Sequence, residues 1–162
     1  HKFFENAKQN AWYKNTIFII TSDHCSIALS PIFSSHYGAY NIPLIIFDPQ
    51  QNTGVTLHHT CQQIDILPSI LDLIKYPSSA FVLGESVFKT NRKNIATTFL
   101  NDTWSLINND TILLLQDNQT NLFLIHQDSL TQNPIKISNT PQEHILKALI
   151  QTYHQTLLNN YH

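Results

Sequence analysis

Hydrophobic and polar residues follow two different patterns along this chain, and the change comes near Gly84. Before it, residues 16–21 and 43–47 form short runs that are apolar at their centres. Such runs are typical of strands buried on both faces, as in a parallel sheet. Apolar residues at helical spacing over 66–74 predict a helix, and residues 2–10 fit the end of another. The first half therefore predicts strands of a parallel sheet flanked by helices.

The second half reads differently. Its short apolar or alternating runs are separated by Asn-Asp and Asp-Asn turns, which predict hairpins of a small antiparallel sheet; the runs cover residues 94–100, 104–107, 111–116 and 121–126. Thr140 and Glu143 form a capping-box pattern that starts a helix reaching about Asn159. On that helix, spacing predicts one apolar face made of Ile145, Leu149, Tyr153 and Leu157.

These patterns together predict an α/β fold. We expect a central mixed, mostly parallel sheet flanked by helices, with a small antiparallel C-terminal sheet and a terminal helix. The chain of 162 residues is 42% hydrophobic and 12% charged, with a formal net charge of −2. That balance offers no basic surplus for nucleic acid and no polybasic patch for a membrane surface. The chain starts at His1 and contains no methionine, so we expect it to be a piece of a longer polypeptide.

Candidate chemistry lies where the first apolar run stops, at Thr21-Ser22-Asp23-His24. In open α/β sheets, ligands bind just beyond the carboxyl ends of the strands. A carboxylate and an imidazole delivered there side by side are both good ligands for a divalent metal. Asp23 and His24 are therefore a candidate metal-binding pair. The alternative is that they are an ordinary strand-end aspartate and a surface histidine.

Three further motifs accompany this pair in a fixed order. They are Ile42-Pro43-Leu44 at the second apolar run, Gln63 to Ser69 (Gln-Ile-Asp-Ile-Leu-Pro-Ser) at the start of a helix, and Gly84-Glu85-Ser86. Together with Asp23-His24, this order resembles the C-terminal part of a sulfatase-type catalytic domain of the alkaline phosphatase superfamily. Within it, the chain is most similar to the lipoteichoic acid synthase and phosphoglycerol transferase branch. The resemblance covers residues 1–90 well and the rest loosely.

The resemblance implies a domain organisation and a cofactor. Residues 1–162 would be the C-terminal part of one catalytic domain, with a core over 1–90 that holds the metal-ligand pair, and the small sheet and C-terminal helix over 91–162. One divalent metal ion, manganese or alternatively magnesium or zinc, would be bound by Asp23 and His24. The family's threonine nucleophile and its remaining ligands would lie upstream. No catalytic nucleophile is therefore expected in this chain, which should be inactive alone.

The resemblance also implies a function. We expect metal-dependent transfer or hydrolysis of a phosphate or sulfate ester, in the form of a phosphoglycerol-type transferase acting on cell-envelope lipid or glycan. Its partner would be an anionic phospho- or sulfo-ester, such as a lipid head group, and not nucleic acid. A missing N-terminal anchor would hold the protein at the cell membrane, with the catalytic domain facing the periplasm or the outside. The alternative is a non-catalytic binding or scaffold domain that keeps the fold.

Other polar residues carry weaker expectations. His36, in the loop after the metal pair, and His59, before the Gln-Ile-Asp segment, are candidate substrate-binding residues, with ordinary loop roles as the alternative. Asp65 is expected to cap the following helix and tie it to a neighbouring loop. Cys25 and Cys61 either pair or are two separate small residues. Related chains often carry a polar or acidic residue within the stretch matching 26–29, which is Ser-Ile-Ala-Leu here.

Overall fold

A computed structural model describes residues 2–26, 31–51, 53–126, 129–130 and 134–159. Residues 27–29 of the Ser-Ile-Ala-Leu stretch and His1 lie outside the described residues. The chain forms two compact units, residues 1–58 and 59–162. The expected grouping of residues 1–90 and 91–162 within one catalytic domain stays a prediction.

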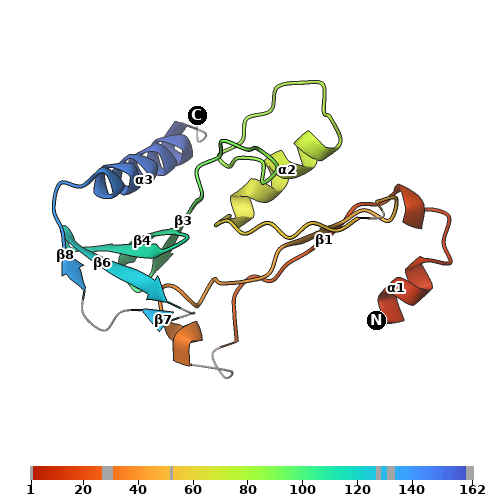
Figure 1. Ribbon diagram of the computed structural model, residues 1–162. Helices are drawn as coiled ribbons and strands as arrows, with labels where there is room; N and C mark the ends of the chain where they lie inside the picture. Colours follow the sequence, from red (N-terminus) through yellow and green to blue (C-terminus); the bar gives the residue numbers. More distant parts are fainter. Residues whose placement is uncertain (1, 27–30, 52, 127–128, 131–133, 160–162) are drawn as a thin grey trace. The chain divides into compact units, whose positions relative to one another are not determined.

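The described residues of the first unit form two strands and three short helical segments. In chain order they are α1 (Lys2–Ala7), the 3-10 turn η1 (Tyr13–Asn15), β1 (Phe18–Ile20), the 3-10 turn η3 (Pro31–Ser34) and β2 (Ile45–Phe47) (Figure 1). Both predicted strands and the helix near the start are thereby confirmed, each shorter than its apolar run. The helical turn η3 lies in the loop that follows the candidate metal pair.

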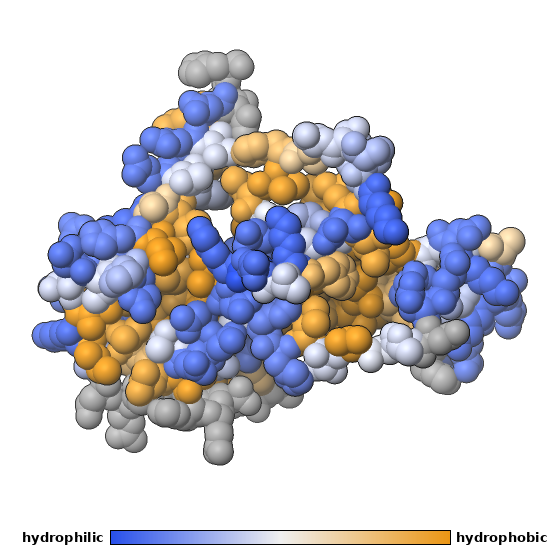
Figure 2. Space-filling view, turned by 45° about the horizontal axis from the view of Figure 1, so that its top comes forward, coloured by the Kyte–Doolittle hydropathy of each residue, from blue (hydrophilic) through white to orange (hydrophobic). Residues whose placement is uncertain are grey.

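The expectation of a mostly parallel sheet is wrong for the described chain. β1 and β2 pair antiparallel, with Phe18 opposite Phe47 and Ile20 opposite Ile45. Ile20 is 40% exposed and Ile45 50% exposed, so this ribbon is not buried on both faces. The apolar run gave the strand but not its direction, because a continuous apolar segment suits either pairing. Figure 2 shows hydrophobic residues, in orange, at many places on the surface of the face viewed.

An aromatic cluster holds the first unit together. The ring of Phe4 on α1 lies 5.1 Å from that of Phe18 and 5.8 Å from that of Phe47, measured between centroids. Phe18 and Phe47 are themselves 5.9 Å apart. These spacings lie in the range that tilted and edge-to-face aromatic pairs prefer. The aromatic residues therefore anchor α1 on the ribbon that leads to Asp23.

The described part of the second unit combines helices with an antiparallel sheet (Figure 1). Its elements are η4 (Gln63–Asp65), α2 (Ile66–Leu73), β3 (Ile95–Leu100), β4 (Thr103–Asn108), β5 (Thr111–Gln116), β6 (Gln119–His126), β7 (Ser129–Leu130), β8 (Ile135–Lys136) and α3 (Pro141–Asn159). Strand order is β3-β4-β5-β6-β7, and β8 also pairs with β6. The predicted small antiparallel sheet and terminal helix are confirmed.

Two tight hairpins set the register of this sheet. Asn101 and Asp102 join β3 to β4, and Asp117 and Asn118 join β5 to β6, all four with positive φ of 49–60°. Two consecutive residues of positive φ define the hairpin turn whose twist matches that of the strands, and Asn and Asp tolerate it best. The Asn-Asp and Asp-Asn pairs in the sequence therefore predict these two hairpin turns correctly.

The core of the second unit lies between α3 and one face of the sheet. It consists of Leu106, Leu113, Leu115 and Leu146, with Leu146 fully buried. The predicted apolar face of α3 is not its buried face, since Ile145, Leu149, Tyr153 and Leu157 are 36–46% exposed. Apolar residues occur on two sides of this helix, so spacing alone did not identify the buried one. The capping pattern is real: the Glu143 N–H donates to Thr140 Oγ1 at 3.3 Å, and Glu143 Oε2 accepts from the Asn139 N–H at 2.9 Å.

Candidate functional site

The candidate metal pair begins three residues after the end of β1 and is open to solvent. The side chain of Asp23 is 85% exposed and that of His24 is 65% exposed. Asp23 Oδ1 accepts a hydrogen bond from the His24 backbone N–H at 2.9 Å. This bond is the main cause that lowers the pKa of Asp23 below its ordinary value of 3.8, followed by Asp23's own N–H and the charge of His24. Asp23 is therefore ionised throughout the neutral range, as a metal ligand must be.

The imidazole of His24 is held in one orientation. Its Nδ1 lies 2.9 Å from the carbonyl oxygen of Cys25. A carbonyl only accepts, so Nδ1 carries the proton and the neutral ring has its lone pair on Nε2. Nε2 faces Asp23 Oδ2 at 3.6 Å. A ring nitrogen fixed by a backbone carbonyl, with the other nitrogen left to bind, is the usual arrangement of a metal-binding histidine.

The spacing of these two donor atoms fits a shared cation. Two ligands about 2.1 Å from a tetrahedral zinc ion lie roughly 3.4 Å apart, close to the observed separation. In the neutral ring Nε2 carries a lone pair, as carboxylate Oδ2 does, so a cation between the two atoms can be bound by both. Among the residues that the structure describes, no group of three or more His, Cys, Asp or Glu side chains is placed to hold a metal. Asp23 and His24 thus fit as part of a ligand set.

His36 lies just after η3 in a tightly turned loop. The Gly38 N–H donates to Ser35 Oγ at 3.0 Å, and a Cβ at Gly38 would overlap the Ile32 carbonyl. The Nδ1 atom of His36 is buried and has no hydrogen-bond partner among the described residues. A buried polar atom of this kind costs free energy unless something binds it. His36 therefore offers a polar atom that a ligand could satisfy.

His59 opens the second unit on a firmly held segment. Burial is the main cause that lowers the pKa of His59 below 6.5, and the nearby Arg92 charge adds to it. The imidazole is consequently neutral at neutral pH. Next to it, the N–H and hydroxyl of Thr60 both donate to Asn109 Oδ1 at 3.0 Å, and Arg92 Nη1 donates to the Thr60 carbonyl at 2.5 Å. Three contacts thus fix the backbone beside His59.

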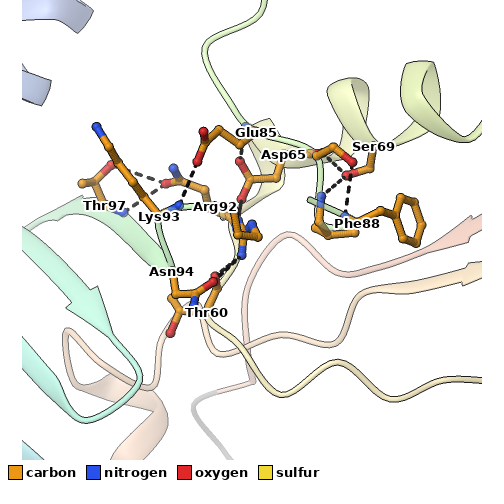
Figure 3. Close-up of polar contacts among 12 residues, drawn as sticks. Thr60, Asp65, Ser69, Glu85, Phe88, Arg92, Lys93, Asn94 and Thr97 are labelled. Atoms are coloured by element: carbon orange, nitrogen blue, oxygen red, sulfur yellow. Dashed lines mark hydrogen bonds and ion pairs between the residues drawn. The ribbon is translucent and has the colours of Figure 1, made fainter. Parts of the chain in front are cut away.

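Asp65 is the centre of the polar network in Figure 3. It is 2% exposed, and its carboxylate accepts from Arg92 Nη2 at 2.7 Å, the Glu85 N–H at 2.9 Å and the Gln62 N–H at 3.0 Å. The expected link to a neighbouring loop is therefore confirmed. The expected side-chain cap on α2 is wrong, because Asp65 forms a capping box with Gln62 at η4 instead. Asp65 is a structural residue.

The sequence did not single out Arg92, Gln62 or Asn109. Arg92 gave no signal, since one arginine in a loop is usually a solvated residue. Gln62 did give a sequence signal, because a polar residue three positions before Asp65 is a capping-box pattern. Gln62 also accepts the Thr97 N–H at 3.0 Å, which ties η4 to β3. The residues that the sequence missed are therefore those that hold the segment from His59 to Asp65.

The cysteines are separate residues. Both Cys25 and Cys61 are free thiols. Cys25 Sγ donates to the Asn41 carbonyl at 3.0 Å. Burial raises the pKa of the Cys61 thiol, so this thiol is protonated at neutral pH and is a weak nucleophile.

Two comparisons with known proteins found a match. Residues 1–76 match the model of the Sulfatase family. A crystal structure of a protein in the alkaline phosphatase superfamily from Vibrio parahaemolyticus superposes with a TM-score of 0.77 at 20% sequence identity. The match covers 99% of this chain and 39% of that one, so the chain spans about two fifths of its length. The search of curated proteins found no match.

Among the described residues, no helix is long and apolar enough to cross a bilayer. The superposition with the solved structure shows that the fold is α/β and alkaline phosphatase-like. Residues 1–76, which include Asp23, His24, His36 and His59, carry the sulfatase-family match.

Proposed function

We propose that this chain supplies part of the active site of an enzyme that transfers or hydrolyses a phosphate or sulfate ester with the help of a divalent metal. The observation that carries the proposal is the geometry of Asp23 and His24. The carboxylate and the correctly oriented Nε2 lie 3.6 Å apart, within the stretch that matches the Sulfatase model. Charge on an anionic ester resists a nucleophile until a cation screens it.

In this proposal Asp23 and His24 hold the metal, with manganese as the first choice and magnesium or zinc as alternatives. When bound, the metal neutralises charge on the ester and lowers the pKa of a coordinated nucleophile. Asp23 brings the negative charge, and its lowered pKa keeps it ionised. In the neutral ring of His24, the hydrogen bond of Nδ1 to the Cys25 carbonyl leaves the lone pair on Nε2.

His36 and His59 are the proposed substrate-binding residues. The unsatisfied Nδ1 of His36 and the neutral imidazole of His59 can each make a hydrogen bond to a phosphoryl or sulfuryl oxygen. Each histidine lies on a segment held by short contacts. We assign no catalytic nucleophile in this chain, and propose that a threonine elsewhere in a longer protein attacks the ester.

The narrower proposal is a phosphoglycerol-type transferase that acts on cell-envelope lipid or glycan. It rests on the combined order of the Asp23-His24, Ile42-Pro43-Leu44, Gln63–Ser69 and Gly84-Glu85-Ser86 motifs. Such an enzyme would act at the cell membrane, facing the periplasm or the outside, and would be held there by an anchor elsewhere in the protein.

An activity assay on the full-length protein tests both levels of the proposal. With manganese present, release of product would be compared for glycerophosphate, phosphoethanolamine and sulfate esters. We expect turnover of glycerophosphate esters, and a loss of at least roughly a hundredfold in Asp23→Asn and His24→Gln. His58→Gln, an exposed histidine of the same unit, is the matched control.

The outcomes separate the two levels. Turnover of sulfate esters alone would contradict the transferase assignment and keep the ester chemistry. Activity that is unchanged in the Asp23 and His24 variants would contradict the metal role. No turnover of any ester would favour the rival, a non-catalytic binding or scaffold domain, which is consistent with the lack of a third ligand among the described residues.

A further inference from the structure

The second unit has a groove that the ester chemistry does not use. It lies between α3 and the ends of β3 to β6 and has a volume of about 670 Å³. This is in the size range of pockets that bind small molecules. Its inner wall is apolar and its rim is polar, formed by the two hairpin turns and the second half of α3.

The inner wall is aromatic. Phe99 and Trp104 face each other across β3 and β4, with ring centroids 4.9 Å apart. His154 of α3 lies 6.1 Å from the Trp104 ring, and Leu115 and Ile150 also line the groove. Phe99 is 50% exposed, although large aromatic side chains gain most free energy when buried. The groove thus presents an uncovered ring surface on one side.

The rim carries hydrogen-bonding groups of both kinds. Asp102 and Asp117 contribute carboxylates, and Asn118, Gln151 and Gln155 contribute amides. The positive φ angles of the turns hold the three turn residues in fixed backbone positions. Lys147 is the one lysine or arginine among the described lining residues. Its Nζ already donates to Glu143 Oε1 at 2.6 Å. The rim is therefore rich in acceptors and repels anions.

We propose that this groove binds a sugar unit of a neutral glycan. A pyranose ring has an apolar face of C–H groups that packs on an aromatic surface, and hydroxyls around its edge that both donate and accept. Phe99 and Trp104 supply the surface, and the rim carboxylates and amides supply partners for the hydroxyls. The carboxylates of Asp102 and Asp117 disfavour the anionic ester in this groove. The inference is independent of the proposed ester chemistry.

A cationic ligand is the competing chemistry, because ammonium groups also favour aromatic rings and carboxylates. Cages for such ligands surround the cation with rings. Here Trp104 packs against both Phe99 and His154, so these rings form one wall. Four side chains of α3 without an aromatic ring or a charge also line the groove, Ile150, Gln151, Gln155 and Leu158. The observations therefore favour the sugar.

Fluorescence titration of the full-length protein tests the proposal. Trp12 and Trp104 are the two tryptophans of this chain, so Trp12→Phe, with any tryptophans elsewhere in the protein also replaced, leaves Trp104 as the reporter. The probes are neutral oligosaccharides of glucose, galactose and N-acetylglucosamine, with choline and glycerol phosphate as cationic and anionic probes. We expect a saturable change in Trp104 emission with a neutral oligosaccharide. Asp102→Asn and Asp117→Asn should weaken it roughly tenfold each, because a charge-assisted bond is lost.

Both substitutions keep a residue that tolerates positive φ, so the turns stay intact. Asp110→Asn removes the same charge from the turn between β4 and β5, outside the groove, and should leave the affinity unchanged. Saturation by choline or glycerol phosphate alone would overturn the proposal. So would no response to any oligosaccharide, or binding that Asp102→Asn and Asp117→Asn weaken no more than Asp110→Asn. Ester turnover is not measured, so this failure is separate from failure of the proposed function.

Discussion

Arg92 Nη2 lies 2.7 Å from Asp65 Oδ2, and both side chains are 3% exposed. This buried ion pair joins η4, at the start of α2, to the loop that leads into β3. Arg92 also reaches the Thr60 carbonyl, so one guanidinium connects the helix start with the segment that carries His59. Figure 3 shows Asp65 and Arg92 at the centre of these contacts. The pair is therefore a polar support of the segment of the second unit that carries His59.

Breaking this pair should be costly. In Arg92→Met the Asp65 carboxylate is left buried without its charged partner, and we expect the free energy of unfolding to fall by about 3–5 kcal/mol. Urea denaturation followed by circular dichroism measures this. Lys93→Met removes the same charge from the neighbouring exposed position and should cost less than about 0.5 kcal/mol. Equal effects of the two variants would show that the pair is not what supports the fold.

Gly84 should not accept a side chain. A Cβ there would overlap the Ile64 carbonyl and come 2.7 Å from Asp65 Oδ1, so Gly84→Ala must displace backbone or the buried carboxylate. We expect a loss of about 1–3 kcal/mol in unfolding free energy. At Gly54 no atom lies within 4 Å of an added Cβ, and φ is not positive, so Gly54→Ala is the matched control. A stable Gly84→Ala protein would contradict the close approach.

Leu146 lies on the buried face of α3, and Leu149 lies on its exposed face. Leu146 is 0% exposed and Leu149, three residues later, is 36% exposed. Leu146→Ala should lower the unfolding free energy by about 2–5 kcal/mol through lost burial and a cavity. Leu149→Ala should cost no more than about 1 kcal/mol, since much of its surface is already in water. Thermal and urea unfolding of the two variants check the difference, and the reverse order would mean that α3 packs with the other face.

His59 should make stability depend on pH. Its pKa in the folded protein is below 6.5, so as pH falls the unfolded chain binds the proton first. The stabilisation is therefore present above pH 6.5 and is lost as pH falls through the folded-state pKa. His59→Gln, which cannot titrate, should lose less stability than wild type between pH 7.5 and pH 5. His58→Gln, at an exposed position, should follow wild type.

A ring-proton titration by NMR measures the pKa of His59 directly. A value at or above 6.5 would contradict both the burial and the effect of Arg92.

Local signals in the sequence predict most of the helices and strands. The features that the sequence did not predict depend on contacts between residues far apart in the chain. The apolar run before Asp23 identified β1, but pairing direction depends on where residues 45–47 return, which no local pattern encodes. On α3 the hydrophobic spacing was real, yet Leu146 rather than Ile145 faces the sheet because Leu106 and Leu113 lie there. The hairpin turns were predictable because positive φ needs particular residues.

The candidate site shows the same division. Asp23 and His24 could be proposed from their place after a strand, because they are adjacent in sequence. The orientation of the His24 ring depends on the Cys25 carbonyl, a conformational detail that the residue types do not give. Arg92 could not be predicted, since its partners Asp65 and Thr60 lie 27 and 32 residues away.

Metal binding is the most direct test of the central claim that Asp23 and His24 are metal ligands. Calorimetric titration of the full-length protein with manganese and zinc would compare wild type, the double variant Asp23→Ala/His24→Ala, and His58→Ala as the exposed control. We predict one stoichiometric site in wild type and in the control, and its loss in the double variant. Binding that is unchanged in the double variant, or no binding by wild type, would contradict the claim.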